Sequence, residues 1–440
     1  MREELAAIVG SEHVREPEAH LLVDQTAVSG MAGHADLVVF PGTADEVAAV
    51  VAWCYAHDVA MVPRGGGTGL AGGAVPVDGG VVISLERMSR VRSFNPLLWR
   101  IEVEAGLTTR TMQRLARENG LLFPVDPGGS EQSQIGGNVA TNAGGPHTFK
   151  HGSMVKWVTG LEVVVAPGEL VRLGGPTRKD VAGYDLRSLF VGSEGTLGIV
   201  TAAWLRLTPA PPVEIALAAT YPSVAEGVEA IERVLASGVV PSVVDYLDGN
   251  TLAVAAGAPF DVPEGTGMAL LCEVDTREED VAELLEALGE TASRPDPTEL
   301  WRWRDGVGLA VDGWHGGRIS EDVAVPLDRL AEAIERSVAL GAAHGIDACS
   351  WGHAGDGNLH TSFVFDPAAP GGRAAAEAAA EDLFAIAIEM GGTITGEHGI
   401  GWLKRGWLSR QWAPAAVRLH EEIKRTLDPK GLFNPGKKTA

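Results

Sequence analysis

Four segments in the first half of the chain are rich in glycine, hydroxyl and amide side chains, and they constrain the fold more than any other feature. They cover residues 63–70, 126–130, 135–145 and 192–201. Glycine permits positive φ angles and lets backbone N–H groups approach a ligand closely, so one such segment can be a phosphate-binding loop or a surface turn. Four of them in one domain are more typical of a long cofactor channel than of unrelated turns.

The first of these segments contains a match to the dinucleotide-binding pattern GxGxxG, at Gly67, Gly69 and Gly72. That pattern requires a helix directly after the glycines, whereas Pro76 and Gly79 follow here. The sequence therefore disfavours an NAD-binding Rossmann site.

The chain has 440 residues, too many for one ordinary core, and patterns typical of helices and strands alternate along it. Prolines at 209, 211 and 212 mark a boundary, after which the expected order of elements is close to a split β-α-β sheet. We predict an α+β protein with a cofactor domain at 1–212, a ferredoxin-like substrate domain at 213–404, and a segment at 405–440 that returns to the first domain. Residues 131–152 show no periodicity, so we expect a ligand loop there.

Charge and cysteine content exclude several classes of function. The net charge of −23 disfavours nucleic acid and anionic membranes as partners, although a local basic pocket can still bind an anionic substrate. Only three cysteines occur, widely separated and without a CxxC pair, which argues against a disulfide framework or an iron–sulfur cluster. Neither a signal peptide nor a membrane-spanning run is evident, and we expect a cytoplasmic protein.

The strongest catalytic signal is the run WGHAGDGNLH at 351–360, together with GEHGIG at 396–401. His353 and His360 would face opposite ways in one continuous strand, but the glycine-rich residues between them allow a turn that brings both imidazoles together. Glu397 supplies a hard oxygen ligand that completes a His/His/Glu metal set. The alternative is that these histidines only satisfy loop hydrogen bonds. His398 is then the candidate general base, because a neutral imidazole near pH 7 can accept a substrate proton.

The glycine-rich segments and the histidine motifs, in this order, resemble the vanillyl-alcohol oxidase/para-cresol methylhydroxylase (PCMH) superfamily. Within it, the greatest similarity is to the branch of D-lactate dehydrogenases, glycolate oxidase FAD subunits and D-2-hydroxyglutarate dehydrogenases, over roughly residues 35–437. The resemblance implies a PCMH-type FAD-binding domain of two subdomains and a ferredoxin-like cap. We expect non-covalent FAD, although His147 and His151 lie in the loop region.

The resemblance also assigns residues to the cofactor. It places the following around FAD: Pro63, Arg64, Gly65, Gly66, Gly67, Thr68, Gly69, Leu70, Pro127, Gly128, Gly129, Ser130, Gly136, Gly137, Thr141, Asn142, Gly144, Gly145, Glu194, Gly195, Ile199, Val200 and Asn434.

For the reaction, the resemblance implies oxidation of a small D-2-hydroxy acid, with hydride passing to flavin N5 and a divalent ion, zinc or manganese, at the His/His/Glu set. Trp301 to Arg304 matches the family's Trp-x-x-Arg pattern, which makes Arg304 a candidate carboxylate clamp. Arg318 lies where relatives usually carry a basic residue, commonly lysine.

A second interpretation belongs to another class of protein. The chain can be an FAD-carrying subunit, inactive alone, of a multi-subunit electron-transfer complex. Because the sequence has no iron–sulfur motif, electrons must leave the flavin for a separate acceptor, such as an iron–sulfur subunit, an electron-transfer flavoprotein, a cytochrome or a quinone. A homodimer is a further possible assembly.

Overall fold

The computed structural model describes residues 1–438, and the chain divides into two compact units. The first unit contains Met1–Gly145, Gly152–Ala210 and Glu397–Ala440. The second contains Pro146–His151 and Pro211–Gly396. In this partition the return to the first unit begins at residue 397, whereas the prediction from sequence places it at residue 405.

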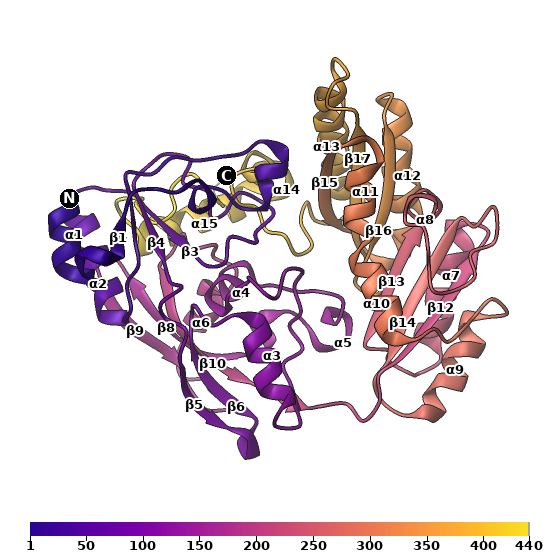
Figure 1. Cartoon of the computed structure of the whole chain (residues 1–440), viewed down its shortest axis with the longest axis horizontal. Helices are drawn as coiled ribbons and strands as arrows, with labels where there is room; N and C mark the ends of the chain where they lie inside the picture. The colour runs from indigo at the N-terminus through magenta and orange to yellow at the C-terminus, as the bar shows by residue number, and fades with distance from the viewer. Residues whose placement is uncertain (439–440) are drawn as a thin grey trace. The chain divides into compact units, whose positions relative to one another are not determined.

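One layer of the first unit is a four-stranded sheet of order β1-β2-β4-β3, in which β2, β4 and β3 run parallel (Figure 1). Phe433 forms an isolated parallel β-bridge with Met61 in the edge strand β3. Backbone hydrogen bonds from this C-terminal segment therefore cover that edge of the sheet. The elements of this layer are α1 (Arg2–Val9), β1 (Val14–Arg15), β2 (Leu37–Val39), α2 (Ala44–Ala56), β3 (Met61–Arg64) and β4 (Val81–Ser84).

The run Thr43-Ala44-Asp45-Glu46 has the sequence pattern of a capping box, and helix α2 begins there. The Thr43 hydroxyl accepts a hydrogen bond from the N–H of Glu46 (3.1 Å), and the Glu46 carboxylate accepts one from the N–H of Gly42 (2.7 Å). The buried residues Val47, Val50, Val51 and Cys54 recur every three or four positions, so one face of the helix packs into the core.

The other layer of the first unit is an antiparallel sheet of order β5-β6-β10-β8-β9. Its strands are β5 (Val91–Asn95), β6 (Arg100–Glu104), β8 (Val158–Val165), β9 (Glu169–Gly174) and β10 (Ile199–Arg206). The remaining elements of the unit are α3 (Thr109–Arg117), β7 (Leu121–Leu122), α4 (Ile135–Thr141), α6 (Leu186–Phe190), β11 (Thr208–Pro209), α14 (Leu408–Gln411) and α15 (Pro414–Leu427).

Residues 131–152, where the sequence shows no periodicity, contain the helix α4. Its residues are poor helix formers, so propensity does not explain the helix. Packing does: Ile135 and Val139 are buried in the core beside β6 and β10. A Cβ on Gly136 would lie 2.6 Å from that of Ala105, so only glycine permits this approach.

The second unit is built on a six-stranded antiparallel sheet of order β12-β14-β13-β16-β17-β15. Its strands are β12 (Ile215–Tyr221), β13 (Val243–Asp248), β14 (Met268–Val274), β15 (Gly317–Ala324), β16 (Asp347–Gly352) and β17 (Asn358–Phe365). Its helices are α5 (Thr148–His151), α7 (Val224–Ala236), α8 (Gly249–Val254), α9 (Glu278–Leu288), α10 (Pro297–Asp305), α11 (Val307–His315), α12 (Leu330–Ala343) and α13 (Gly372–Glu389).

This sheet consists of two halves with the same topology. The first half runs β12-α7-β13-β14-α9 and the second runs β15-α12-β16-β17-α13, and in each the third strand pairs between the first and the second. The halves join where β13 pairs with β16, through only two residue pairs, Tyr246–Gly352 and Leu247–Trp351. The ferredoxin-like fold predicted for this region is therefore confirmed, as two split β-α-β halves side by side.

Helices cover both faces of the six-stranded sheet. Helices α7, α9, α12 and α13 form one layer, in which α12 packs on β16 and α13 on β15 and β17 (Figure 1). Leu252 of α8, Leu300 of α10 and Val311 of α11 pack on the opposite face, against Leu247 and Trp351. Polar residues on that face are consequently enclosed rather than exposed to water.

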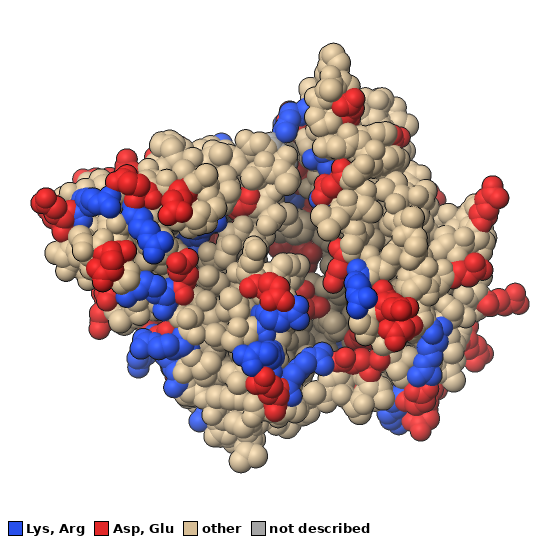
Figure 2. Space-filling model, in the orientation of Figure 1, with Lys and Arg blue, Asp and Glu red and all other residues tan. Residues whose placement is uncertain are grey.

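The surface carries mixed charges with an acidic excess. Figure 2 shows acidic side chains spread across the visible face of the molecule, with Lys and Arg interspersed among them. In residues 1–438, no helix combines the length and the hydrophobicity that crossing a bilayer requires.

Candidate functional site

The loop after β3 presents unoccupied backbone donors. The N–H groups of residues 65–70 donate no hydrogen bond to another backbone group of residues 1–438. Gly66 lies against a neighbouring loop so closely that a Cβ there would be 1.9 Å from the carbonyl oxygen of Gln132. Gly67 has a φ of 68°, which favours glycine. The loop is therefore a compact turn with free amides, as a pyrophosphate site requires.

Arg64, at the end of β3, holds this loop in place. Its guanidinium is buried and donates to the carbonyl oxygens of Val23 and His20, both over 2.7 Å. Burial lowers its pKa. These two bonds occupy both of its terminal nitrogens, so its visible role is to support the loop.

The start of α4 lies beside the same loop. A Cβ on Gly65 would be 3.5 Å from Cα of Gly137. A Cβ on Gly137 or on Gly128 would meet no protein atom within 4 Å, and Gly129 lies next to Thr68. Backbone without side chains thus forms a cradle with room for a ligand, and the residues present fit a flat, phosphate-bearing cofactor such as FAD.

Two residues predicted to contact the cofactor, Glu194 and Asn434, form hydrogen bonds with other residues of the first unit. Glu194 has a φ of 53°, and its carboxylate accepts from the N–H groups of Ile400 (3.0 Å) and Gly401 (2.6 Å) and from Nζ of Lys438. Asn434 donates its amide to the carbonyl oxygens of Gly73 (2.9 Å) and Glu194 (2.7 Å). These contacts fix segments of the first unit around the cradle.

The other residues assigned to FAD also lie in the first unit. Pro63 contacts Gly195, where a Cβ would be 2.4 Å from the proline ring. Asn142 accepts from the N–H of Val155 (2.9 Å), and Ile199 and Val200 are buried in β10.

In the second unit, strand register brings an aspartate and a histidine together. Because Tyr246 pairs with Gly352, the adjacent residues Asp245 and His353 lie opposite one another at the seam between β13 and β16. Oδ1 of Asp245 is 2.7 Å from Nδ1 of His353. Burial opposes the charge of Asp245, but Arg304 and His353 outweigh it and lower its pKa.

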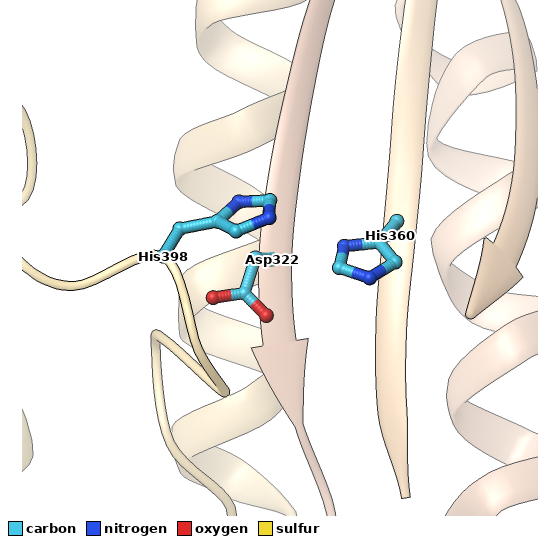
Figure 3. Close-up of side chains that lie close together, drawn as sticks. All are labelled: Asp322, His360 and His398. Carbon is cyan, nitrogen blue, oxygen red and sulfur yellow. The ribbon is translucent and has the colours of Figure 1, made fainter. Parts of the chain in front are cut away.

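His360 lies on β17 directly opposite Asp322 on β15, and both side chains are buried (Figure 3). Their potential ligand atoms are within 4.8 Å of each other, as are those of His353 and His360. The rings of His353 and His360 are 5.3 Å apart and perpendicular. The 3-10 turn at Ala354–Asp356, followed by Gly357 with a φ of 67°, reverses the chain between them. The predicted approach of the two histidines is confirmed.

The second unit ends at a residue anchored beside this pair. The N–H of Gly396 donates to Oδ2 of Asp322 over 2.9 Å, and Asn358 donates to Oδ1 over 2.6 Å. Glu397 and His398 follow Gly396 directly, and consecutive Cα atoms are about 3.8 Å apart. Glu397 Oε1 and His398 Nε2 are 3.7 Å apart, and about a fifth of each side chain is exposed.

Both arginines assigned to the substrate carboxylate already have acidic partners. Arg304 on α10 donates Nε and Nη2 to Oδ2 of Asp245, each over 2.8 Å. Arg318 on β15 pairs through Nε with Asp312 (3.0 Å) and donates Nη1 to the carbonyl oxygen of Gly308 (3.0 Å). Burial lowers the pKa of Arg318.

His147 and His151 lie beside carboxylates of the second unit. His147 is 3.0 Å from Glu273 and His151 is 3.6 Å from Asp275, which Lys150 also contacts. Glu273 further accepts from the Trp301 indole over 2.8 Å.

Sequence reasoning missed the carboxylates that organise this unit, Asp245, Asp322 and Glu273. In strands with alternating character, such residues usually face water. The one available signal was their position in expected strands of a ferredoxin-like domain, in which helices pack against the sheet.

Both halves of the chain match known protein families. Residues 35–174 match the family described as "FAD binding domain", and residues 210–438 match "FAD linked oxidases, C-terminal domain". The glycolate oxidase subunit GlcD of Bacillus subtilis is 34% identical, covering 99% of this chain and 96% of its own.

Other relatives carry other substrate names. A D-2-hydroxyglutarate dehydrogenase of Xanthomonas citri pv. viticola is 36% identical, over 91% of this chain and 88% of its own. A probable mitochondrial D-lactate dehydrogenase of Danio rerio is 35% identical, over 91% and 84%. Among solved structures, 4-ethylphenol oxidase from Gulosibacter chungangensis aligns with a TM-score of 0.77 at 21% identity, over 100% of this chain and 96% of its own. A p-cresol methylhydroxylase aligns with a TM-score of 0.75 at 18% identity, over 99% and 95%.

Proposed function

The chain belongs to the FAD-linked oxidases, and we propose that it oxidises a small D-2-hydroxy acid to the corresponding 2-oxo acid. Its resemblance to the vanillyl-alcohol oxidase/PCMH superfamily is confirmed by the family matches and by the fold of p-cresol methylhydroxylase. The observation that carries the proposal is the presence in one chain of a glycine cradle and of a buried, carboxylate-supported histidine pair.

FAD would be held without a covalent bond by the loop at 63–70 and the start of α4. The free N–H groups of the loop suit the pyrophosphate, and the open space at Gly128 and Gly137 suits the rest of the cofactor. Bound FAD supplies the acceptor for the hydride that leaves C2 of the acid. His147 and His151 are paired with Glu273 and Asp275, which supports non-covalent binding.

His353, His360 and Glu397 would hold a divalent ion, zinc or manganese. The support is the hydrogen bond from Nδ1 of His353 to buried Asp245, because histidines that bind metals usually donate their other ring nitrogen to a carboxylate. A bound divalent ion polarises the substrate hydroxyl and makes its proton easier to remove.

His398 would accept the hydroxyl proton, since it follows Glu397 directly and a neutral imidazole is a suitable base near pH 7. Arg304 and Arg318 would supply positive charge for the substrate carboxylate.

A second candidate function has a specific observation in its favour. The Bacillus subtilis relative covers 99% of this chain and is named as a subunit of glycolate oxidase. The chain would then work as the FAD-carrying part of a complex and pass its electrons to a separate acceptor. Turnover of the isolated chain with an artificial dye counts against this alternative.

The test is to mix the purified flavoprotein, without oxygen, with a panel of D- and L-2-hydroxy acids and to follow the flavin band near ~450 nm. Bleaching by one D-acid or by glycolate would support the proposed oxidation and identify the substrate. A flavin-bearing protein that no acid bleaches contradicts the oxidation and favours the subunit alternative.

A further inference from the structure

Asp245 has two side-chain partners, and the proposed reaction uses only one of them. It is fully buried at the seam between β13 and β16, and its two oxygens serve different partners. Oδ1 accepts from His353, and Oδ2 accepts both Nε and Nη2 of Arg304. One carboxylate therefore links a candidate metal ligand to a candidate substrate clamp.

Arg304 is not free to leave this pair. Its side chain is 12% exposed and that of Asp245 is 0% exposed, so separating them would leave a buried carboxylate short of a partner. Helix α10 is also fixed on both sides of the arginine. The Trp301 indole donates to Glu273 over 2.8 Å, and the Trp303 indole donates to the carbonyl oxygen of Ala255 over 3.2 Å.

Arg318 is in a different situation. Its partner Asp312 lies on α11 with 43% of its side chain exposed, so this carboxylate can turn to water when Arg318 meets another anion. Arg318 and Asp322 stand on the same face of β15, because they are four residues apart in one strand. Opposite them on β17 are Val364 and His360, so Arg318 belongs to the face that carries the histidine pair.

We propose that Asp245 is a positioning residue that fixes the ring of His353 for metal binding, that Arg304 supports Asp245 in this task, and that Arg318 is the arginine that contacts the substrate carboxylate. This inference rests on the proposed function. Contact with the substrate carboxylate, which the sequence assigns to both arginines, is here given to Arg318 alone. Asp245 orients the imidazole through Nδ1, and Nε2 is the ring nitrogen proposed to bind the ion.

The experiment titrates Mn²⁺ into the purified FAD-loaded protein without substrate and then measures KM for the acid. We expect Asp245→Asn to weaken Mn²⁺ binding roughly 10- to 100-fold, the usual effect of removing a carboxylate behind a ligating histidine. Arg304→Met should weaken it too, and the effect of the double variant should be smaller than the sum of the two single effects, because the residues act as one pair. Arg318→Met should leave Mn²⁺ binding unchanged and raise KM.

Unchanged Mn²⁺ binding in Asp245→Asn would overturn the inference. So would an Arg304→Met protein that keeps its Mn²⁺ affinity and shows the rise in KM expected of Arg318→Met. FAD content and the thermal midpoint show whether each variant is folded. If a single change unfolds the unit, the double variant Asp245→Asn/Arg304→Met replaces it, because no unpaired buried charge remains.

The same titration separates this inference from the proposed function. If Mn²⁺ binding depends on Asp245 but no 2-hydroxy acid reduces the flavin, the positioning role stands and the proposed substrate class is wrong. If the unmodified protein binds neither Mn²⁺ nor Zn²⁺, the metal site and the role of Asp245 are both overturned.

Discussion

The backbone N–H of Gly396 donates to Oδ2 of Asp322 over 2.9 Å. Asp322 in turn lies directly opposite His360 across two paired strands. Gly396, the residue before Glu397, is thus hydrogen-bonded to the strand that pairs with the strand of His360. This bond fixes the last residue of the second unit, which directly precedes Glu397 and His398 in the chain.

Replacing Gly396 by alanine should disturb this anchor. A Cβ there would lie 2.2 Å from Nδ2 of Asn358 and 2.8 Å from Oδ1 of Asp322, so the segment must shift. We expect reduced metal content and activity with FAD retained, measured by elemental analysis and flavin reduction. Gly313→Ala is the control, because its Cβ meets no atom within 4 Å. Equal behaviour of the two variants would contradict the anchoring role.

His360→Ala should lower metal content and activity together, because the proposed ion loses a ligand. Metal analysis after dialysis measures the first and anaerobic flavin reduction the second. The matched control is His315→Ala, in the same unit, whose side chain is 40% exposed and pairs with Asp347. Full metal retention in His360→Ala would remove it from the ligand set.

His398→Ala should slow flavin reduction by about 10²- to 10⁴-fold, the usual contribution of a general base, while FAD stays bound. Stopped-flow absorbance measures the rate, and the protein-bound flavin spectrum confirms loading. His344→Ala, which removes a peripheral histidine paired with Asp382, should reduce at the normal rate. An unchanged rate in His398→Ala would exclude this histidine as the base.

Two glycines in the cradle should respond differently to alanine. Gly66→Ala forces a Cβ to 1.9 Å from a backbone oxygen, so we expect the fold itself to lose about 1–3 kcal/mol of stability. Gly137→Ala meets no protein atom within 4 Å, so the apoprotein should keep its thermal midpoint and lose FAD affinity. Flavin fluorescence titration measures the affinity, with Gly406→Ala as control. Normal FAD binding by Gly137→Ala would place the cofactor elsewhere.

The stability of the second unit should fall in acid partly through Glu273. Burial opposes its charge, but hydrogen bonding from His147, Ser242 and Trp301 outweighs it and lowers its pKa below the usual 4.5. Glu273 therefore contributes stability above pH 4.5 that is lost as pH falls through its lower folded pKa.

Accordingly, the difference in thermal midpoint between wild type and Glu273→Gln should be largest near neutral pH and shrink towards about pH 3. Thermal melts followed by tryptophan fluorescence across this range measure it. Glu335→Gln, an exposed carboxylate on α12, should show no such trend. A constant difference at every pH would contradict the assignment.

Local sequence rules predicted much of this fold. The capping box at Thr43 is present in the structure. No helix lies between Gly72 and β4, so the GxGxxG match does not form a Rossmann dinucleotide site. The turn between His353 and His360 followed from the glycines between them. These features depend on residues that are close in sequence, so patterns in the sequence reveal them.

Long-range pairing was outside the reach of such patterns. Asp245 and His353 are 108 residues apart, and only the register of β13 and β16 brings them together. Helix α4 forms from poor helix formers because Ile135 and Val139 are buried against the sheet. Tertiary packing determines both the Asp245–His353 contact and the formation of α4. Local sequence patterns do not reveal such packing.

The bridge from Phe433 to Met61 has a consequence for biosynthesis. Residue 61 leaves the ribosome long before residue 433, yet the edge of β3 is covered only when that later segment arrives. Until then β3 offers unpaired backbone groups to any passing strand. The nascent first unit therefore stays incomplete until the second unit and the segment around Phe433 have been translated.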